Sequence, residues 1–110
     1  MVNKRLLKSR DKILFEKIIE DATMDCYNEY EQISGWACVL EDNIMVPCKC
    51  LIEKETAILN KVDMNSNSSE IFGVIKLNKS NIRVPIEDIS LENPDSMLYI
   101  DAYRYWRKNG

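Results

Sequence analysis

The side chains most capable of chemistry in this chain are carboxylates gathered in one stretch. Residues 18–48 contain no lysine or arginine and seven acidic residues: Glu20, Asp21, Asp25, Glu29, Glu31, Glu41 and Asp42. Carboxylates without local counter-charges repel one another, and either solvation or a bound cation relieves that repulsion. Calcium takes about six to eight oxygen ligands from carboxylates, carbonyls and water. The stretch is therefore a candidate hard-cation site, with a solvated acidic surface as the alternative.

A second group of oxygen ligands follows in the middle of the chain. Asp63, Asn65 and Asn67 stand at alternate positions, as at the start of an EF-hand loop, and Glu70 follows them. The pattern then fails, because the sixth position is serine instead of glycine and the twelfth is valine instead of glutamate. The sequence excludes an EF-hand and leaves these residues as further candidate ligands.

Cysteine and histidine usage argues against a transition-metal site or an enzyme. The chain has no histidine and four cysteines: Cys26, Cys38, Cys48 and Cys50. Their spacing differs from the paired C-x₂-C pattern of zinc ribbons, so we interpret them as buried, reduced thiols. No nucleophile elbow, P-loop or dinucleotide fingerprint is present. We expect no catalytic residues, no organic cofactor and no enzymatic activity.

Composition and charge are those of an ordinary globular chain. The 110 residues carry a net charge of −3, so no overall field attracts the protein to nucleic acid or to an anionic membrane. Residues 1–17 carry six bases against two acids, which we interpret as a solvated helix face. No apolar run is long enough to span a membrane, and the start of the chain lacks the apolar segment of a signal peptide. We expect a cytoplasmic protein with no nucleic-acid or membrane partner.

Helical periodicity predicts the elements that carry the acidic stretch. Residues 3–21 form an amphipathic pattern with Ile13, Leu14 and Ile18 on the apolar stripe. A second helix is predicted over 29–42, ending at Asn43 in a left-handed conformation. Gly35 inside this helix costs about 1 kcal/mol relative to alanine, which suggests a close approach to the sheet. A closing helix is predicted over 96–107, with Asp95 or Ser96 as its cap.

Between these helices the period changes to two. Alternation predicts strands at 44–53, 56–64, 71–77 and 82–86, with Pro47 indicating an edge or a bulge in the first of them. Short strands joined by short turns favour a small SH3-like antiparallel barrel. We therefore predict one α+β domain over 1–110: a helical part at 3–42, a small β-barrel at 44–92 and the closing helix.

Several motifs together resemble a known family. Asp25-Cys-Tyr-x-x-x-Glu31-Gln-x-x-Gly35-Trp36 is followed by Leu40-Glu-Asp-Asn-Ile44 and by Pro47. This order is similar to the signature of a family of small bacterial calcium-binding proteins, the CcbP type. The similarity continues through Val62-Asp-Met64, Glu70-Ile-Phe-x-Val74, Ile82-x-Val84-Pro-Ile86 and Ile100-Asp-Ala-Tyr-Arg-Tyr-Trp106. It covers roughly residues 18–108.

The resemblance implies a compact α+β protein that binds calcium through acidic side chains, as a non-catalytic buffer or sensor. The acids on matching motif positions, and hence the candidate metal residues, are Asp25, Glu31, Glu41, Asp42, Asp63 and Glu70. The chain departs from the family pattern at Ala37-Cys38-Val39, where aromatics are usual, and in the neutral loop 65–69, which is often acidic. Fewer charges imply weaker binding. The alternative is an SH3-like protein–protein interaction module that keeps the fold without the ion and has an unidentified protein partner.

Overall fold

The computed structural model describes residues 9–67 and 69–109. The elements in chain order are α1 (Ser9–Thr23), α2 (Glu29–Asn43), β1 (Cys48–Ile52), β2 (Glu55–Met64), β3 (Ile71–Leu77), β4 (Ser80–Pro85), the 3-10 helix η1 (Ile86–Asp88), β5 (Ser90–Leu91) and α3 (Pro94–Asn109). Each helix and long strand that falls in this range was expected from the sequence. The predicted helical residues 3–8 lie outside the described residues.

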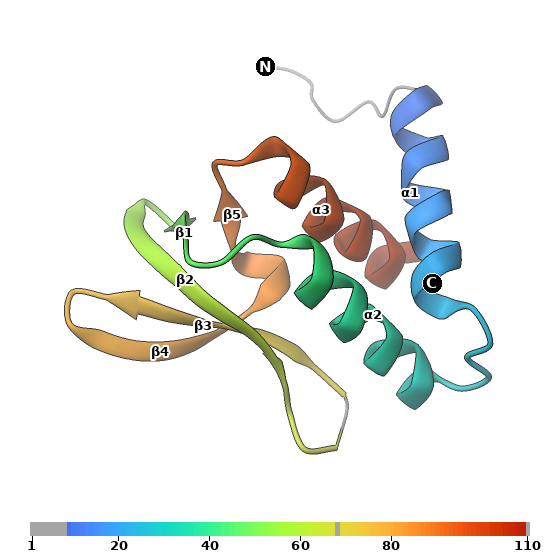
Figure 1. Cartoon of the computed structure of the whole chain (residues 1–110), viewed down its shortest axis with the longest axis horizontal. Helices are drawn as coiled ribbons and strands as arrows, with labels where there is room; N and C mark the ends of the chain where they lie inside the picture. Colours follow the sequence, from blue (N-terminus) through green and yellow to red (C-terminus); the bar gives the residue numbers. More distant parts are fainter. Residues whose placement is uncertain (1–8, 68, 110) are drawn as a thin grey trace.

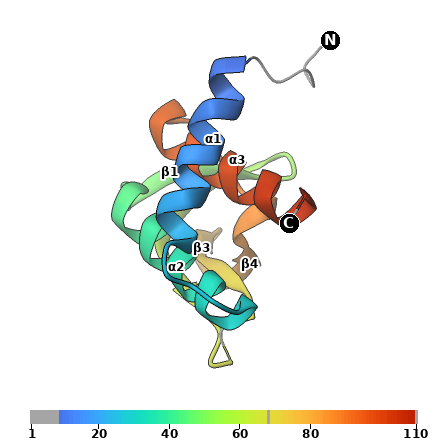
Figure 2. The same cartoon turned by 90° about the vertical axis from the view of Figure 1, so that its right-hand side faces the viewer.

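The strands form one antiparallel sheet, and the helices cover one of its faces. The strand order is β4-β3-β2-β1-β5. In Figure 1 the sheet lies on the left and the helices on the right, and in the turned view of Figure 2 the helices stand in front of the strands. The predicted α+β class is confirmed.

The predicted SH3-like barrel is not confirmed, because the sheet is open. A barrel must pair its two edge strands, whereas here β4 and β5 are the opposite edges of the sheet. β5 has only two residues, and η1 separates it from β4. The inner face of the sheet is instead covered by α2 and α3, whose Trp36 and Tyr103 are fully buried. Side chains of the helices thus cover the apolar face of the sheet. In a closed barrel, the strands themselves would enclose this core.

Aromatic packing joins α2 to α3 at the centre of the molecule. Trp36 lies edge-on to Tyr103 with 5.3 Å between ring centroids, and Trp106 lies 5.7 Å from Trp36 and 6.0 Å from Tyr103. Aromatic pairs at such separations contribute about 0.5–1.5 kcal/mol beyond the area they bury. Ile33 and Leu40 complete the buried stripe of α2. This stripe fixes the rotation of α2 about its axis.

The first helix buries a different stripe from the predicted one. Ile13 and Leu14 are 64% and 41% exposed, whereas Phe15, Ile18 and Ala22 are buried. Phe15 packs against Tyr105 of α3 with 5.5 Å between ring centroids. The prediction was correct for Ile18 but wrong for Ile13 and Leu14, because three successive apolar residues fit the helical period in more than one register. The position of α3 selects Phe15.

The helix ends also differ from the prediction in their capping residues. Asn43 lies within α2, and the residue that follows it, Ile44, is extended instead of left-handed. The cap of α3 is Asn93, whose side chain accepts the N–H groups of Asp95 and Ser96 at 2.8 and 3.1 Å. Asn93 is followed directly by a proline at the first helical position, which is the common arrangement at a helix start.

A bulge in β2 determines which of its side chains reach the core. The register with β3 shifts between Leu59 and Lys61, so Asn60 is an extra residue that reverses the alternation. Leu59 and Val62 consequently both face inward and are buried, while Lys61 and Asp63 point to the opposite face. Without the bulge, Val62 would lie on the solvent-exposed face of the sheet.

No helix within the described residues is long and apolar enough to cross a membrane.

Gly35 permits the contact between α1 and α2. A methyl group placed there would collide with the backbone carbonyl of Ala22, at the end of α1. The predicted close approach is therefore correct, but the neighbour is a helix and not the sheet. We expect Gly35→Ala to lower the free energy of unfolding by about 2 kcal/mol, because overpacking exceeds the gain in helix propensity. Urea denaturation measures this difference.

Cys38→Ala is the matched control for Gly35→Ala, since Cys38 is exposed on the same helix. It should change stability by less than about 0.5 kcal/mol. Equal stability of both variants would show that α1 and α2 do not approach as described.

Candidate metal centre

Glu31 has a structural task at the amino end of α2. Its N–H donates to Asn28 Oδ1 at 2.9 Å, and its Oε1 accepts the Tyr27 N–H at 2.8 Å. The arrangement is close to a capping box, except that the Glu31 carboxylate accepts the N–H of Tyr27, which precedes the cap residue Asn28. The spacing Asn28-x-x-Glu31 is the sequence signal for such a cap. The carboxylate is exposed and retains one oxygen outside this bond.

Asp25 lies in the turn that precedes this cap. It is exposed, and its φ of 60° is in the left-handed region, which Asp and Asn adopt more readily than most residues. Asp25 and Glu31 thus belong to the same end of α2, one in the turn and one in the cap.

Glu41 and Asp42 lie at the opposite end of α2. Both are exposed in its last turn, which contains no basic residue. The carboxyl end of a helix carries a partial negative charge and carbonyl groups without intrahelical partners. Two carboxylates there raise the negative potential further, so this end of α2 is electrostatically unfavourable without a cation.

The two ends of α2 are too far apart to share one ion. Glu31 and Glu41 are ten residues apart, which corresponds to about 15 Å along a helix axis. Calcium–oxygen distances are about 2.3–2.6 Å. The acidic stretch that is continuous in sequence therefore forms two separate groups of carboxylates in space.

Asp63 lies on the face of the sheet that the helices do not cover. Its Oδ2 is 3.8 Å from Lys61 Nζ and 3.8 Å from Arg83 Nη2, and its Oδ1 accepts the N–H of Met64 at 2.8 Å. Its side chain is 34% exposed. Asp63 therefore has two basic neighbours and is separated by the sheet from the carboxylates of α2.

Glu70 closes the loop between β2 and β3. Its N–H and that of Ser69 both donate to Asn65 Oδ1 at 2.9 Å, while the Asn65 N–H donates to the Glu70 carbonyl at 3.1 Å. Ser69 also donates its hydroxyl to Asn67 Oδ1. The amide oxygens that imitate an EF-hand are thus engaged in holding the loop together, and the Glu70 side chain is exposed.

The six predicted ligands do not converge on one point. Among the described residues, no group of three or more histidine, cysteine, aspartate or glutamate side chains is placed to hold a metal ion. Glu41 with Asp42 is the pair that combines adjacent carboxylates, carbonyl groups at a helix end and no basic neighbour in that turn. The carboxyl end of α2 is therefore the candidate place for a calcium ion, which would need further ligands from carbonyls and water.

The core also contains two buried polar atoms without hydrogen-bond partners among the described residues, Trp36 Nε1 and Tyr103 Oη. An indole N–H is only a donor, so these atoms do not form a cation site. Burial raises the pKa of Tyr103 to about 12; Arg107 acts to lower it, and Glu87 and Glu70 act to raise it. The hydroxyl is therefore neutral and buried near two acidic side chains.

The cysteines show no sign of a thiolate metal site. Cys50 is buried and Cys48 half-buried, both on the inner face of β1. The predicted burial was wrong for Cys38, which is exposed on α2. Burial raises the pKa of both thiols, and Cys48 raises that of Cys50 further. All four cysteines are unpaired, and raised pKa values keep the inner pair as neutral thiols.

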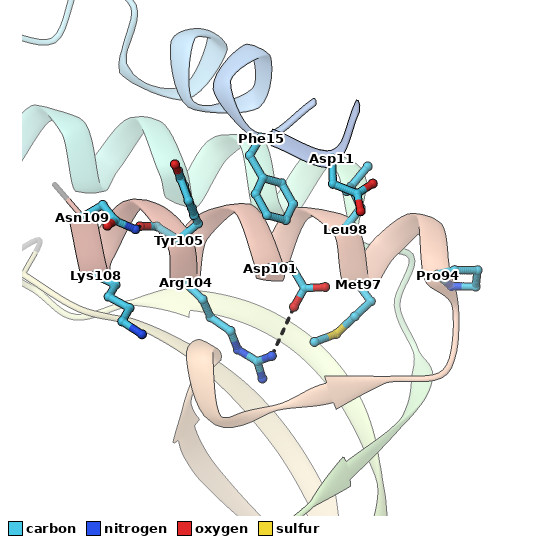
Figure 3. Close-up of a pocket in the computed structure, with 10 residues that line it drawn as sticks. All are labelled: Asp11, Phe15, Pro94, Met97, Leu98, Asp101, Arg104, Tyr105, Lys108 and Asn109. Carbon is cyan, nitrogen blue, oxygen red and sulfur yellow. Dashed lines mark hydrogen bonds and ion pairs between the residues drawn. The ribbon is translucent and has the colours of Figure 1, made fainter. Parts of the chain in front are cut away.

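A groove of about 710 Å³ lies between α1 and α3 and is shown in Figure 3. In its wall, Asp101 Oδ1 is 3.2 Å from Arg104 Nη1. Arg104 also donates to the carbonyls of Glu87 and Ile89, at 2.8 and 3.0 Å. Burial raises the pKa of Asp101, and the neighbouring Arg104 offsets part of that shift. Asp101 in this groove is therefore paired with a base, which makes it a poor candidate for a calcium ligand.

A family profile and two solved structures are similar to this chain. The sequence profile of the CcbP family, described as calcium binding, matches residues 16–107. A solved calcium-binding protein in its calcium-binding form matches with a TM-score of 0.77 and 16% identity, over 94% of this chain and 98% of that one. Crystalline CcbP from Anabaena matches with a TM-score of 0.74 and 14% identity, over 96% and 95% of the two chains. No curated protein sequence matches.

The capping role of Glu31 predicts a stability effect that calcium does not alter. Glu31→Ala should lower the free energy of unfolding by about 0.5–1 kcal/mol with or without calcium, because one capping bond is lost. Glu29→Ala, in the same exposed turn, is the control and should cost only a few tenths of a kcal/mol. Loss of calcium-dependent stabilisation in Glu31→Ala alone would instead identify Glu31 as a ligand.

The unpartnered hydroxyl of Tyr103 predicts a stabilising substitution. Tyr103→Phe should raise the free energy of unfolding by about 1 kcal/mol at neutral pH, because a buried polar group without a partner is removed. Between pH 10 and 12 the folded protein holds the phenolic proton more tightly than the unfolded chain, so wild-type stability falls as pH rises through this window. The variant lacks this loss, and its advantage should grow with pH.

Denaturation series across this pH window measure the effect of Tyr103→Phe. Tyr27→Phe is the control, since Tyr27 is 86% exposed. Its replacement should change neither the stability at neutral pH nor the dependence of stability on pH. Destabilisation of Tyr103→Phe by 1 kcal/mol or more would mean that the hydroxyl has a hydrogen-bond partner in solution.

Proposed function

Because the chain belongs to the CcbP family of calcium-binding proteins, we propose that it binds Ca²⁺ at the carboxyl end of α2, as a non-catalytic buffer or sensor. The observation that carries this placement is the last turn of α2, where Glu41 and Asp42 are exposed and no base is present. The family profile spans this turn.

Electrostatics favours this end of the helix over the others. A divalent cation there interacts favourably with two carboxylates and with the negative end of the helix dipole. Asp25 and Glu31 lie at the amino end, where the dipole already favours their negative charge. Asp63 has Lys61 and Arg83 beside it. A calcium ion would therefore bind less favourably at the amino end of α2 or beside Asp63.

The ligand set implies a low affinity. Two carboxylates supply fewer charges than the calcium sites of intracellular sensors, and carbonyl oxygens and water would supply the other ligands. Calcium sites of low charge and limited rigidity bind at about 0.1–1 mM. Such a site responds to large changes in calcium concentration and releases the ion readily.

A non-catalytic role in the cytoplasm accords with the remaining chemistry. The chain has no histidine, and its four cysteines are unpaired, as expected in a reducing compartment. The family is described by calcium binding alone.

Replacement of the pair tests the proposed site. Calcium at ten times the dissociation constant should stabilise the wild type by about 1.4 kcal/mol, which raises Tm by about 5 °C. Glu41→Gln with Asp42→Asn should remove this shift. Without calcium the double variant should be more stable than the wild type by about 0.5–1 kcal/mol, because two unfavourable charge–dipole interactions are lost. Calorimetric titration and thermal unfolding measure both quantities.

Two further variants separate this site from its alternatives. Glu53→Gln with Glu55→Gln removes two exposed charges from the β1–β2 hairpin and should leave the calcium response unchanged. Asp25→Asn with Glu31→Gln should also leave it unchanged, and its loss there would move the site to the other end of α2. Absence of any heat or thermal shift at millimolar calcium would favour the interaction module that keeps the fold without the ion.

A further inference from the structure

The face of the sheet that the helices leave uncovered has its own chemical pattern. Directly opposed residues of antiparallel strands share a face, so the register assigns the outward side chains strand by strand. They are Lys49 and Leu51 of β1; Thr56, Ile58, Lys61 and Asp63 of β2; Phe72, Val74 and Lys76 of β3; and Asn81, Arg83 and Pro85 of β4. We call these residues the outer sheet face.

Bases on this face flank apolar side chains in two adjacent rows. Ile58 of β2 lies opposite Lys49 on one side and Lys76 on the other. In the next row Val74 of β3 lies opposite Lys61 and Arg83. Neighbouring strands are about 4.8 Å apart, so the two bases of a row stand about 10 Å apart across an apolar centre. The bulge at Asn60 brings Lys61 onto this face.

The charges of the outer sheet face do not cancel. It carries four bases and one acid, Asp63, which pairs with Lys61 and Arg83. Lys49 and Lys76 are exposed and have no ion pair among the described residues. The face is therefore positive in a protein whose net charge is −3.

The apolar centre of the face is accessible. Ile58 and Val74 are partly exposed, and Leu51 is 41% exposed. The helices lie on the other side of the sheet, as Figure 2 shows. An uncovered, partly apolar surface rimmed by charged groups is a common feature of interaction sites.

We propose that the outer sheet face docks an acidic segment of a partner protein in which carboxylates alternate with small apolar side chains. The carboxylates would pair with Lys49 and Lys76, and an apolar side chain would contact Ile58 between them. A polyanion without apolar groups would leave this centre uncovered. This docking site is independent of the calcium site at the end of α2, which lies on the helical side.

The same face fits a single-stranded nucleic acid less well. Binding of unpaired bases relies on exposed aromatic rings on which the bases stack. Phe72 is the one aromatic residue of the outer sheet face, and the Arg83 guanidinium lies over its ring, 5.5 Å from the centroid. The remaining apolar residues are aliphatic and give bases no stacking platform.

Fluorescence polarisation with a labelled peptide of repeating Glu-Ser-Val-Ser tests the proposal. In an extended chain this repeat presents Glu and Val alternately on one face. Wild-type protein should bind it at low ionic strength and lose affinity as salt is added. Lys49→Gln with Lys76→Gln should weaken binding by about fivefold or more. Ile58→Thr should weaken it without changing the salt dependence.

Matched controls define the outcomes. Lys12→Gln with Lys17→Gln makes the same charge change at exposed positions of α1 and should leave the affinity within about twofold of wild type. The Lys-Ser-Val-Ser peptide should not bind. Equal weakening by both double variants, or no binding by wild type, would overturn the proposal.

Two other occupants give distinct results. Tighter binding of a labelled single-stranded oligonucleotide, with the same dependence on Lys49 and Lys76, would overturn the proposal in favour of a nucleic acid. Self-association that Lys49→Gln with Lys76→Gln abolishes, and that the acidic peptide does not displace, would overturn it in favour of a second copy. Each measurement is made with calcium and with chelator, so a failure of the calcium site does not affect its interpretation.

Discussion

Burial of the apolar stripe of α2 is the constraint on which the rest of the structure depends. Ile33, Trp36 and Leu40 have no exposed surface, and complete burial of such a side chain contributes about 1.5–3 kcal/mol. A helix with one apolar stripe has one favourable rotation against the sheet. That rotation turns Glu41 and Asp42 towards solvent at the carboxyl end of the helix. The exposure of the acidic residues is thus a consequence of core packing.

The same packing places the carboxylates of α2 and the bases of the outer sheet face on opposite sides of the sheet. α2 covers the inner face of the sheet, so its carboxylates lie on the helical side. The bulge at Asn60 keeps Val62 in the core and sends Lys61 to the other side. Since the sheet is open, the bases of β1 to β4 then form an outer surface instead of the wall of a closed barrel. The proposed calcium site and the proposed docking site for an acidic segment therefore lie on separate faces of one small domain.

Sequence periodicity predicted the helices and strands better than it predicted how they pack against one another. The strand at 71–77 and the body of α2 were predicted correctly, because β-branched alternation and apolar residues at helical spacing are local signals. The open sheet was not predicted, because closure into a barrel depends on whether helices cover the inner face. The choice of Phe15 over Leu14 as a core residue likewise depends on contacts with Tyr105, which local spacing does not encode. The capping role of Glu31 was visible in the spacing from Asn28.

Closeness in sequence did not translate into closeness in space for the candidate ligands. Helical rise separates Glu31 from Glu41, and strand alternation sends Asp63 to the opposite face of the sheet. A third carboxylate beside Glu41 and Asp42 would have to stand three or four residues before them on the helix. Those positions are Ala37, Cys38 and Val39, none of which has an oxygen atom in its side chain. The departure from the family pattern in this tripeptide therefore adjoins the proposed site and leaves backbone and water to complete it. The low affinity that we propose for calcium is thus attributed to this local sequence and not to a change of fold.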